Sequence, residues 1–365
     1  MGKAKKKNFS VPSLSLPFLK KQKLALGLDI GSHAVKICEL AEAGSGYKLV
    51  ALGSARIPAE ALEDGALQNP EAVGRVISNL ISNLKIKHKK VAISISGYSV
   101  IVKKINLSVM TDEELEKHIH SEAEQYIPFD IEEVYLDFQD LKTNTEGEDR
   151  TDVMLVAAKR EVVDGYLAML RNVGLQPVVV DVDAFALENA FEANYGIEDN
   201  VVLVDIGASK MNINIISQGA SILARDVVLG SRQLTEQIQN HFDLAFDEAE
   251  ALKTGETLDR EKQGEIEGLF INNCNQWMTE VKRAIDFYYS NHPDEKISKI
   301  ILSGGGAKIK GLNDFFAKET DIPVEIFNPF RKASVDTSTI DPAYLEQIAP
   351  EMTLAAGLAT RPVEV

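Results

Sequence analysis

Two copies of one short pattern carry residues that could hold a charged ligand. Each copy is an apolar, β-branched run followed by Asp-Ile-Gly and a turn of small residues, over Leu26–Ile37 and again over Val201–Ile216. Each copy predicts a β-hairpin with an aspartate, Asp29 or Asp205, at its mouth. The glycine after each aspartate allows close backbone approach to a ligand, and successive N–H groups in such a turn suit phosphate oxygens.

The two aspartates would repel a bare phosphate. A hydrated Mg²⁺ between carboxylate and phosphate removes that conflict, because this ion keeps several waters and needs few protein carboxylates. Either Asp-x-Gly alone is equally typical of a plain hairpin turn. The repetition favours a clamp on a Mg-nucleotide, with Asp29 and Asp205 beside the ion and Gly31 and Gly207 at the phosphates.

Composition bounds the class of protein. The chain has 365 residues, is 45% hydrophobic and carries a net charge of −16, which argues against general nucleic-acid binding. Its two cysteines, Cys38 and Cys274, lie in apolar patterns typical of buried free thiols, which favours a reducing cytoplasm. No segment approaches the roughly 18 apolar residues of a membrane span, so we expect no bilayer crossing.

The first 23 residues differ from the remainder and are predicted to be a basic, flexible tail. They contain seven lysines and no acid, together with apolar residues between Phe9 and Leu19. Such a tail could bind an anionic membrane surface or could simply be solvated, and the sequence leaves both open. The lysine-rich run 85–90 has the same two interpretations, with a solvated helix end the simpler one.

Hydrophobic periodicity predicts an α/β chain. We expect strands at 47–57, 90–96, 134–141, 152–158, 177–182 and 299–302, and helices at 70–84, 161–173, 184–195 and 268–291. A further helix begins at the capping box Thr111/Glu114 and ends before Pro128. The segment 246–264 is predicted to be polar and helical with a loose turn, and the aromatic stripe of 268–291 to be core.

A third glycine-rich turn, Gly304–Gly306, follows the strand at 299–302 and could let backbone approach a flat ring such as adenine. This signal is weak alone. The turn is neither a Walker loop nor a dinucleotide fingerprint.

Four motifs in order, Asp29–Ser32, 181–189, Asp205–Gly207 and Ile301–Gly306, resemble the phosphate-1, first-connection, phosphate-2 and adenosine motifs of the actin, heat-shock chaperone and sugar-kinase superfamily. The resemblance extends from Leu24 to the C-terminus. It implies an actin-like fold, with ATP and Mg²⁺ in a cleft between two ribonuclease-H-like halves. The residues that it implies at the nucleotide are Asp29, Gly31, Ser32, His33, Lys36, Asp205, Gly207, Ala208, Ser209, Lys210, Glu280, Arg283, Gly304, Gly305, Gly306 and Lys308. For Glu280 and Arg283, an exposed salt-bridged pair is the alternative.

Within that superfamily the chain resembles the PilM family of type IV pilus assembly proteins, with the division protein FtsA as a more distant relative. The segments that carry this resemblance are 26–37, 126–134, 156–187 and 278–289. It implies a first core subdomain (24–100, 176–198 and 341–365), an inserted α+β subdomain (101–175), a second core subdomain (199–232 and 295–340) and an outer subdomain (233–294).

The same resemblance implies partners. A groove between the inserted and first core subdomains would receive the cytoplasmic N-terminal peptide of the inner-membrane protein PilN. It also implies that the chain binds pilus motor ATPases and platform proteins and forms a homo-oligomer or ring. The chain would be cytoplasmic and peripheral to the inner membrane.

The sequence differs from ATP-hydrolysing relatives at positions that those relatives use for hydrolysis. Ala208, Ser209 and Lys210 replace the glycine and threonine that follow the second Asp-x-Gly in the chaperones, and Asp183 stands where relatives place the carboxylate that orients the attacking water. A short aspartate would align that water poorly. We therefore expect ATP binding with slow or no turnover. An ATP-hydrolysing filament or division protein resembling FtsA is the alternative, and a sugar or acetate kinase is a distant third.

Overall fold

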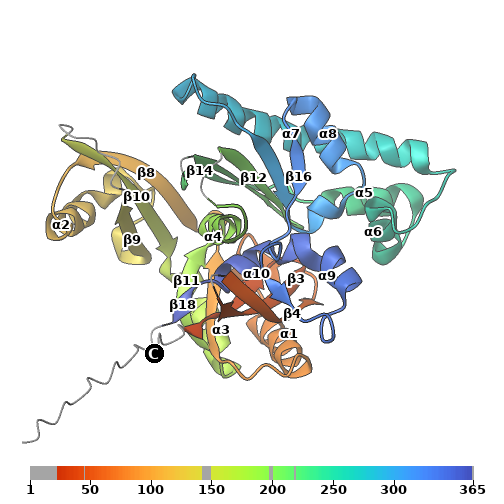
Figure 1. Cartoon of the computed structure of the whole chain (residues 1–365), viewed down its shortest axis with the longest axis horizontal. Helices are drawn as coiled ribbons and strands as arrows, with labels where there is room; N and C mark the ends of the chain where they lie inside the picture. The colour runs from red at the N-terminus through yellow and green to blue at the C-terminus, as the bar shows by residue number, and fades with distance from the viewer. Residues whose placement is uncertain (1–22, 45, 142–148, 197–199, 218, 364–365) are drawn as a thin grey trace, which may run out of the picture.

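The structure is a computed structural model that describes residues 23–44, 46–141, 149–196, 200–217 and 219–363. Two larger sheets form its frame (Figure 1). The first has the order β11 (Gln176–Val182), β7 (Lys90–Ile95), β2 (Leu26–Ile30), β3 (Ala34–Ala43), β4 (Gly46–Arg56) and β17 (Ser334–Val335). The second has the order β14 (Ala220–Val227), β13 (Met211–Ser217), β12 (Val201–Ile206), β15 (Lys299–Ser303) and β16 (Val324–Ile326). They are called here the first and second halves.

Both predicted hairpins are confirmed, and they have the same surroundings. β2 pairs antiparallel with β3 and parallel with β7, as β12 pairs antiparallel with β13 and parallel with β15. Every residue of β2 and of β12 is buried, as expected of near-continuous apolar runs in sheets covered on both faces. Each half therefore presents an Asp-Ile-Gly turn at the end of a central strand.

Helices α4 (Asp183–Tyr195) and α10 (Thr353–Leu358) lie between the two sheets (Figure 1). Two glycines permit this close packing. A Cβ on Gly357 would lie 1.8 Å from the carbonyl oxygen of Ala186, and one on Gly27 would lie 2.0 Å from that of Ala355. The C-terminal helix thus returns to the first half, as predicted. Near it, α9 spans Pro342–Ile348, and β1 (Lys23–Leu24) pairs with β18 (Pro362–Val363).

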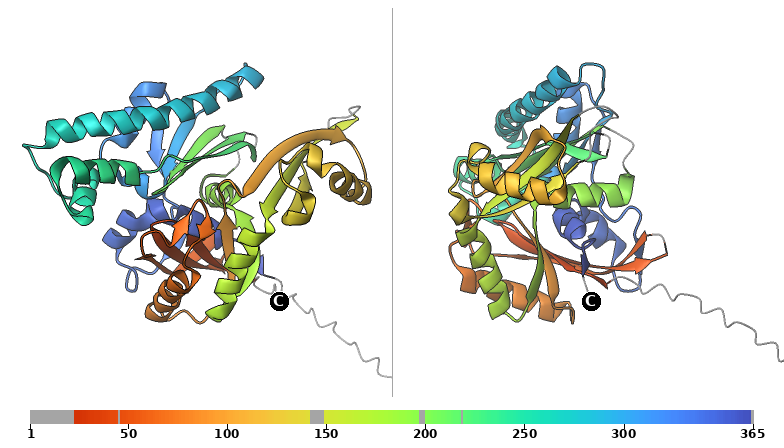
Figure 2. Two further views of the ribbon diagram at one scale, coloured as in Figure 1. Left: turned by 180° about the vertical axis from the view of Figure 1, so that it is seen from behind. Right: turned by 90° about the vertical axis from the view of Figure 1, so that its left-hand side faces the viewer.

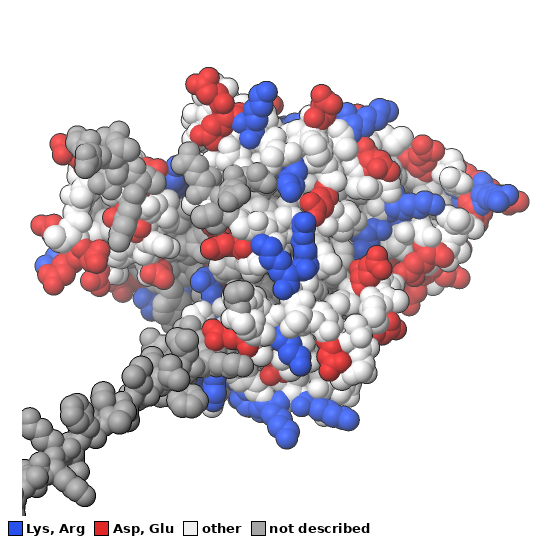
Figure 3. Space-filling view, in the orientation of Figure 1, with Lys and Arg blue, Asp and Glu red and all other residues white. Residues whose placement is uncertain are grey.

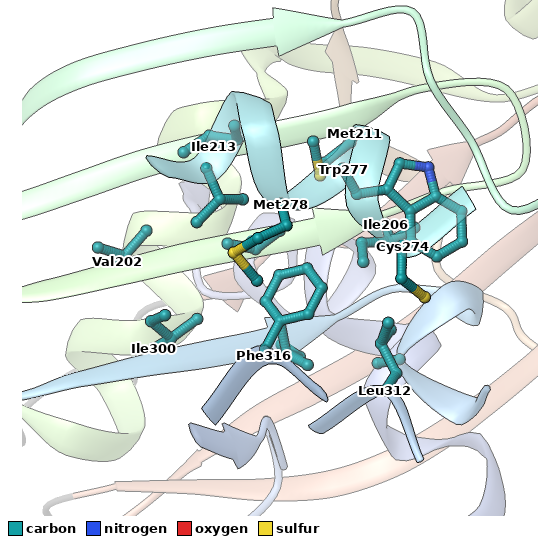
Figure 4. Close-up of a cluster of buried hydrophobic side chains, with 14 of the residues drawn as sticks. Val202, Ile206, Met211, Ile213, Cys274, Trp277, Met278, Ile300, Leu312 and Phe316 are labelled. Carbon is teal, nitrogen blue, oxygen red and sulfur yellow. The ribbon is translucent and has the colours of Figure 1, made fainter. Parts of the chain in front are cut away.

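The outer helices cover the far face of each sheet. In the first half these are α1 (Pro70–Asn83) and α3 (Arg160–Asn172), with the short hairpin β5 (Leu62–Glu63) and β6 (Ala66–Leu67). In the second half they are α5 (Arg232–Phe242), α6 (Phe246–Thr254), α7 (Gln263–Asn291) and α8 (Leu312–Thr320). Trp277 and Met278 of α7 pack against Val202, Ile206 and Ile213 (Figure 4). This confirms the stripe as core, where each large side chain contributes about 2 kcal/mol.

The segment between β7 and α3 forms a separate unit, which projects to one side in Figures 1 and 2. It contains β8 (Val100–Ser108), α2 (Asp112–Glu122), β9 (Val134–Asp140) and β10 (Arg150–Lys159), with sheet order β8-β10-β9. The predicted capping box is present, because Thr111 and Glu114 bond each other's backbone N–H groups. Leu115 and Ile119 of α2 are buried on the sheet. This unit is called here the inserted unit.

The polar helical segment with a loose turn that was predicted over 246–264 is confirmed in part. α6 stops at Gly255, whose φ of 78° is left-handed, and α7 begins at Gln263 rather than at 268. Gly264 and Gly268 misled the prediction, since each faces open space and α7 tolerates both. Among the described residues, no helix has the length and apolarity needed to span a membrane. The predicted tail lies outside the described residues except for Lys23.

Candidate functional site

A cavity of about 600 Å³ lies between the two Asp-Ile-Gly hairpins, a size typical of small-molecule sites. Both hairpins, α5, α6 and the turn after β15 line it. Most of the residues predicted from sequence meet there, namely Asp29, Gly31, Ser32, His33, Lys36, Asp183, Asp205, Gly207, Ala208, Ser209, Lys210, Gly304, Gly305 and Lys308.

The first hairpin holds a partly buried ion pair within itself. Asp29 and Lys36 are direct cross-strand partners on β2 and β3, and Lys36 Nζ lies 2.8 Å from Asp29 Oδ2. Burial alone would lower the pKa of Lys36, but Asp29 outweighs burial and raises it. The turn closes through the Gly31 N–H, which donates to the carbonyl oxygen of Ala34 at 3.1 Å. This hairpin therefore presents a fixed cation beside a carboxylate.

The second hairpin has the same shape but a different charge arrangement. The Gly207 N–H donates to the carbonyl oxygen of Lys210 at 2.8 Å, so the turn closes as in the first hairpin. Asp205 accepts a hydrogen bond of 2.8 Å from Ser303 Oγ. Burial, together with the nearby charge of Asp29, raises the pKa of Asp205 to about 6. The two aspartates are thus close enough to affect each other electrostatically.

Lys210 pairs across the cavity with the first half. Its Nζ lies 2.8 Å from Asp183 Oδ2 at the start of α4, and Ser96 Oγ donates to the same oxygen at 2.6 Å. Burial alone would raise the pKa of Asp183, but Lys210 and the neighbouring serines outweigh burial and lower it. This pair joins the two halves at the floor of the cavity.

Other contacts close the cavity mouth. Ser209 Oγ donates to Ser32 Oγ, and an Arg232 Nη2 donates to the Ser32 carbonyl oxygen, each at 2.8 Å. His33 stacks on Phe246 with ring centroids 5.8 Å apart. At the rim, Arg56 pairs with Asp247 at 2.5 Å. The structure therefore has its halves in direct contact around the cavity.

Glu280 and Arg283 are not brought to the cavity, although the resemblance implied them there. Among the described residues, neither lines it. Glu280 instead pairs with Arg283 and with Arg225 of β14, which is the kind of ion pair that the alternative describes. A role of these two residues at a nucleotide stays a prediction. Gly306 packs behind the cavity wall, where a Cβ would lie 2.4 Å from Ile206 Cγ2.

The sequence analysis missed Glu250 and Lys253 of α6, which do line the cavity. Lys253 is buried, lies 2.8 Å from Glu250 and donates to Thr235 Oγ1 at 2.9 Å. Burial lowers the pKa of Lys253. A lysine on the buried face of a short helix, three residues after a glutamate, was the available signal.

The carboxylates fit a hydrated cation. In the described part of the chain, no group of three His, Cys, Asp or Glu side chains gathers to hold a metal ion. Asp29 and Asp205 nevertheless face one cavity from opposite hairpins. Two carboxylates are what Mg²⁺ uses when waters and phosphates supply its other ligands.

A family model described as "Type IV pilus assembly protein PilM" matches residues 27–363. This chain belongs to the PilM family. A solved structure described as the "PilM-PilN type IV pilus biogenesis complex" is 31% identical, with a TM-score of 0.82, and the match covers 94% of this chain and 100% of that one. The ethanolamine utilization protein EutJ from Carboxydothermus hydrogenoformans is 17% identical over 92% of this chain and 89% of that one, with a TM-score of 0.54. This PilM-family chain has the actin-like fold.

A second hollow of about 280 Å³ in this PilM-family chain lies where the inserted unit, the first half and β14 meet. Ile101 and Val102 of β8, Val182, and Ala224 of β14 supply apolar lining. Residues 95–98 and Asp183 line both this hollow and the main cavity, so they form a common wall. Asp226 of the second half fixes that wall, since its Oδ2 accepts the Gly97 N–H at 2.7 Å.

Proposed function

We propose that this chain is an ATP-binding cytoplasmic adaptor of the type IV pilus inner-membrane platform. It binds the cytoplasmic N-terminal peptide of PilN and relays between the motor ATPase and the platform, peripheral to the inner membrane. Family membership supports the assembly role, and the relative in complex with PilN supports that partner. The observation that carries nucleotide binding is the pair of opposed Asp-Ile-Gly hairpins on one cavity.

The cavity residues divide by chemistry. Asp29 and Asp205 suit a hydrated Mg²⁺, and the cations Lys36 and Lys210 suit phosphate oxygens. The bare backbone of Gly304–Gly305 and the Glu250–Lys253 pair suit the nucleoside. The bound Mg²⁺ would neutralise phosphate charge.

The state of Asp183 supports slow or absent turnover. Its Oδ2 already accepts from Lys210 and Ser96, so this carboxylate is engaged rather than free to orient a water. Hydrolysis depends on such positioning. ATP then acts as a conformational ligand, which requires only that it binds one state of the chain better than another.

The second hollow is the peptide site in this proposal. Its apolar lining and the exposed Tyr98 and Val228 on its edges suit an extended peptide captured by apolar pockets and main-chain bonds. Because residues 95–98 and Asp183 line both cavities, a ligand in one would act directly on the wall of the other. Nucleotide and peptide are therefore expected to change each other's affinity by the same factor.

The test is a titration of labelled PilN N-terminal peptide into the purified chain, with and without Mg-ATP. Val102→Asp, in the second hollow, should weaken peptide binding at least tenfold and leave ATP binding intact. Val50→Asp is the matched control, because Val50 is an exposed strand valine on β4 outside both cavities. Equal peptide binding by both variants would contradict the site.

Single-turnover ATP hydrolysis in the same samples completes the test. Bound ATP that persists uncleaved is the expected result. Steady cleavage, faster with peptide, would instead favour the ATP-hydrolysing alternative and make Asp183 a catalytic residue.

A further inference from the structure

A basic surface lies at the end of the first half opposite the cavity. The cavity is at the carboxyl ends of the parallel strands β2, β7 and β11, and the lysines lie where these strands begin. Lys85, Lys87 and Lys89 precede β7, Lys23 precedes β2, and all four are exposed. In Figure 3, Lys and Arg side chains gather along the lower edge of the molecule. We call Lys23, Lys85, Lys87 and Lys89 the basic end.

The loop that carries three of these lysines has a fixed shape. Ile86 is buried in the core, and its N–H donates to the carbonyl oxygen of Ile81 at 3.1 Å. The Lys89 carbonyl oxygen accepts the Gln176 N–H at 2.8 Å. Because Ile86 points inward, Lys85 and Lys87 on either side of it are held outward.

Lys85 occupies a position that glycine normally takes. It follows the C-cap of α1 with a φ of 55°, a left-handed conformation that costs any residue with a Cβ. The neighbouring helix α3 ends at the equivalent position with Gly174, at a φ of 77°. The residue after the C-cap is therefore a lysine in α1, whereas it is a glycine in α3.

The charges of the basic end are not neutralised locally. Among the described residues, none of its four lysines forms an ion pair within 4 Å. The sequence from 83 to 94 contains no Asp or Glu. Burial lowers the pKa of His88, opposed by Glu39 and helped by Lys23 and Lys90, so burial disfavours the charged form of this side chain. This contrasts with a net charge of −16 for the whole chain.

The sequence that leads into Lys23 favours lipid as the partner. Residues 1–22 contain six further lysines and no acid, interspersed with Phe9, Leu14 and Phe18. Lysines alone would suit any polyanion, whereas apolar residues interspersed among lysines are the pattern of segments that bind an anionic membrane interface. We propose that the basic end docks directly on an anionic phospholipid bilayer, so that the cavity faces away from the membrane.

The test uses the full-length chain and sedimentation with vesicles. Vesicles containing phosphatidylglycerol should bind it, pure phosphatidylcholine vesicles should not, and salt should weaken binding. Each lysine near an anionic leaflet strengthens binding roughly fivefold. The triple variant Lys85→Gln/Lys87→Gln/Lys89→Gln should therefore lower the partition coefficient by about a hundredfold.

The matched control is Lys117→Gln/Lys296→Gln/Lys318→Gln, which removes the same charge from exposed lysines elsewhere and should bind like wild type. Thermal unfolding would verify that both variants fold. If deletion of residues 1–22 abolishes binding while the Lys85/Lys87/Lys89 variant binds normally, the basic end is not the docking surface. Binding of duplex DNA with the same lysine dependence, in preference to vesicles, would also overturn the proposal.

Discussion

Two partly buried lysine–aspartate pairs line the cavity at the same distance, but they connect different parts of the molecule. Lys36 and Asp29 lie within one hairpin, and Lys210 and Asp183 join the second half to the first, each pair 2.8 Å apart. The first pair is set by strand register alone. The second pair exists only while the halves are closed. The Lys36–Asp29 pair therefore orders one hairpin, whereas the Lys210–Asp183 pair holds the two halves together.

The largest expected effect comes from removing the acceptor of the bridging pair. Asp183→Ala leaves Lys210 and Ser96 without their shared partner. The Lys210 side chain is 31% exposed, so we expect a loss of about 2 kcal/mol of unfolding free energy. Urea unfolding measures this loss. The double variant Asp183→Ala/Lys210→Met should recover much of it. A loss that is unchanged in the double variant would show that the pair itself is not the cause.

A comparison of Lys210→Met with Lys36→Met distinguishes the pair that joins the halves from the pair within one hairpin. Lys210→Met should let the halves part and speed amide hydrogen exchange at residues 96–99 about tenfold, which corresponds to about 1.4 kcal/mol of local stability. Lys36→Met should leave exchange there near the wild-type rate, because its pair stays within one hairpin. Hydrogen-exchange mass spectrometry distinguishes the two, and equal rates in both variants would remove the contrast.

The bridging pair should also weaken in acid. The pKa of Asp183 is lowered below its ordinary value of 3.8, so its stabilisation is present above that pH and is lost as pH falls through the folded-state pKa. The unfolding free energy of wild type should exceed that of Asp183→Asn at pH 6, and the difference should shrink below about pH 3.8. Thermal melts across this range provide the measurement, and a constant difference would contradict the assignment.

The smallest effect is expected at the rim. Arg56 and Asp247 also bridge the halves, but their side chains are 59% and 71% exposed. Exposed pairs contribute about 0.5 kcal/mol or less. Arg56→Ala should therefore change neither the unfolding free energy nor the exchange of residues 96–99 measurably. A large effect in either measurement would show that the Arg56–Asp247 pair, rather than Lys210, holds the halves together.

The sequence was sufficient where the signal is local. The Asp-Ile-Gly repeat predicted both hairpins, because an apolar run and a small turn determine a hairpin without help from distant residues. It could not predict the pairing of Lys210 with Asp183, which depends on how two halves close. The family resemblance implied Glu280 and Arg283 at the nucleotide, but neither lines the cavity in this structure. Glu250 and Lys253 were overlooked because helical periodicity does not say which helix reaches the cavity.

Titration of Mg-ATP into wild type, Asp29→Ala and Asp205→Ala tests the central claim most directly. If the hairpins clamp a Mg-nucleotide, wild type binds ATP in a Mg²⁺-dependent manner and each substitution raises the Kd at least tenfold, which corresponds to about 1.4 kcal/mol. Thermal unfolding without nucleotide controls for folding. An ATP affinity unchanged in both folded variants would contradict the clamp and with it the proposed role of nucleotide.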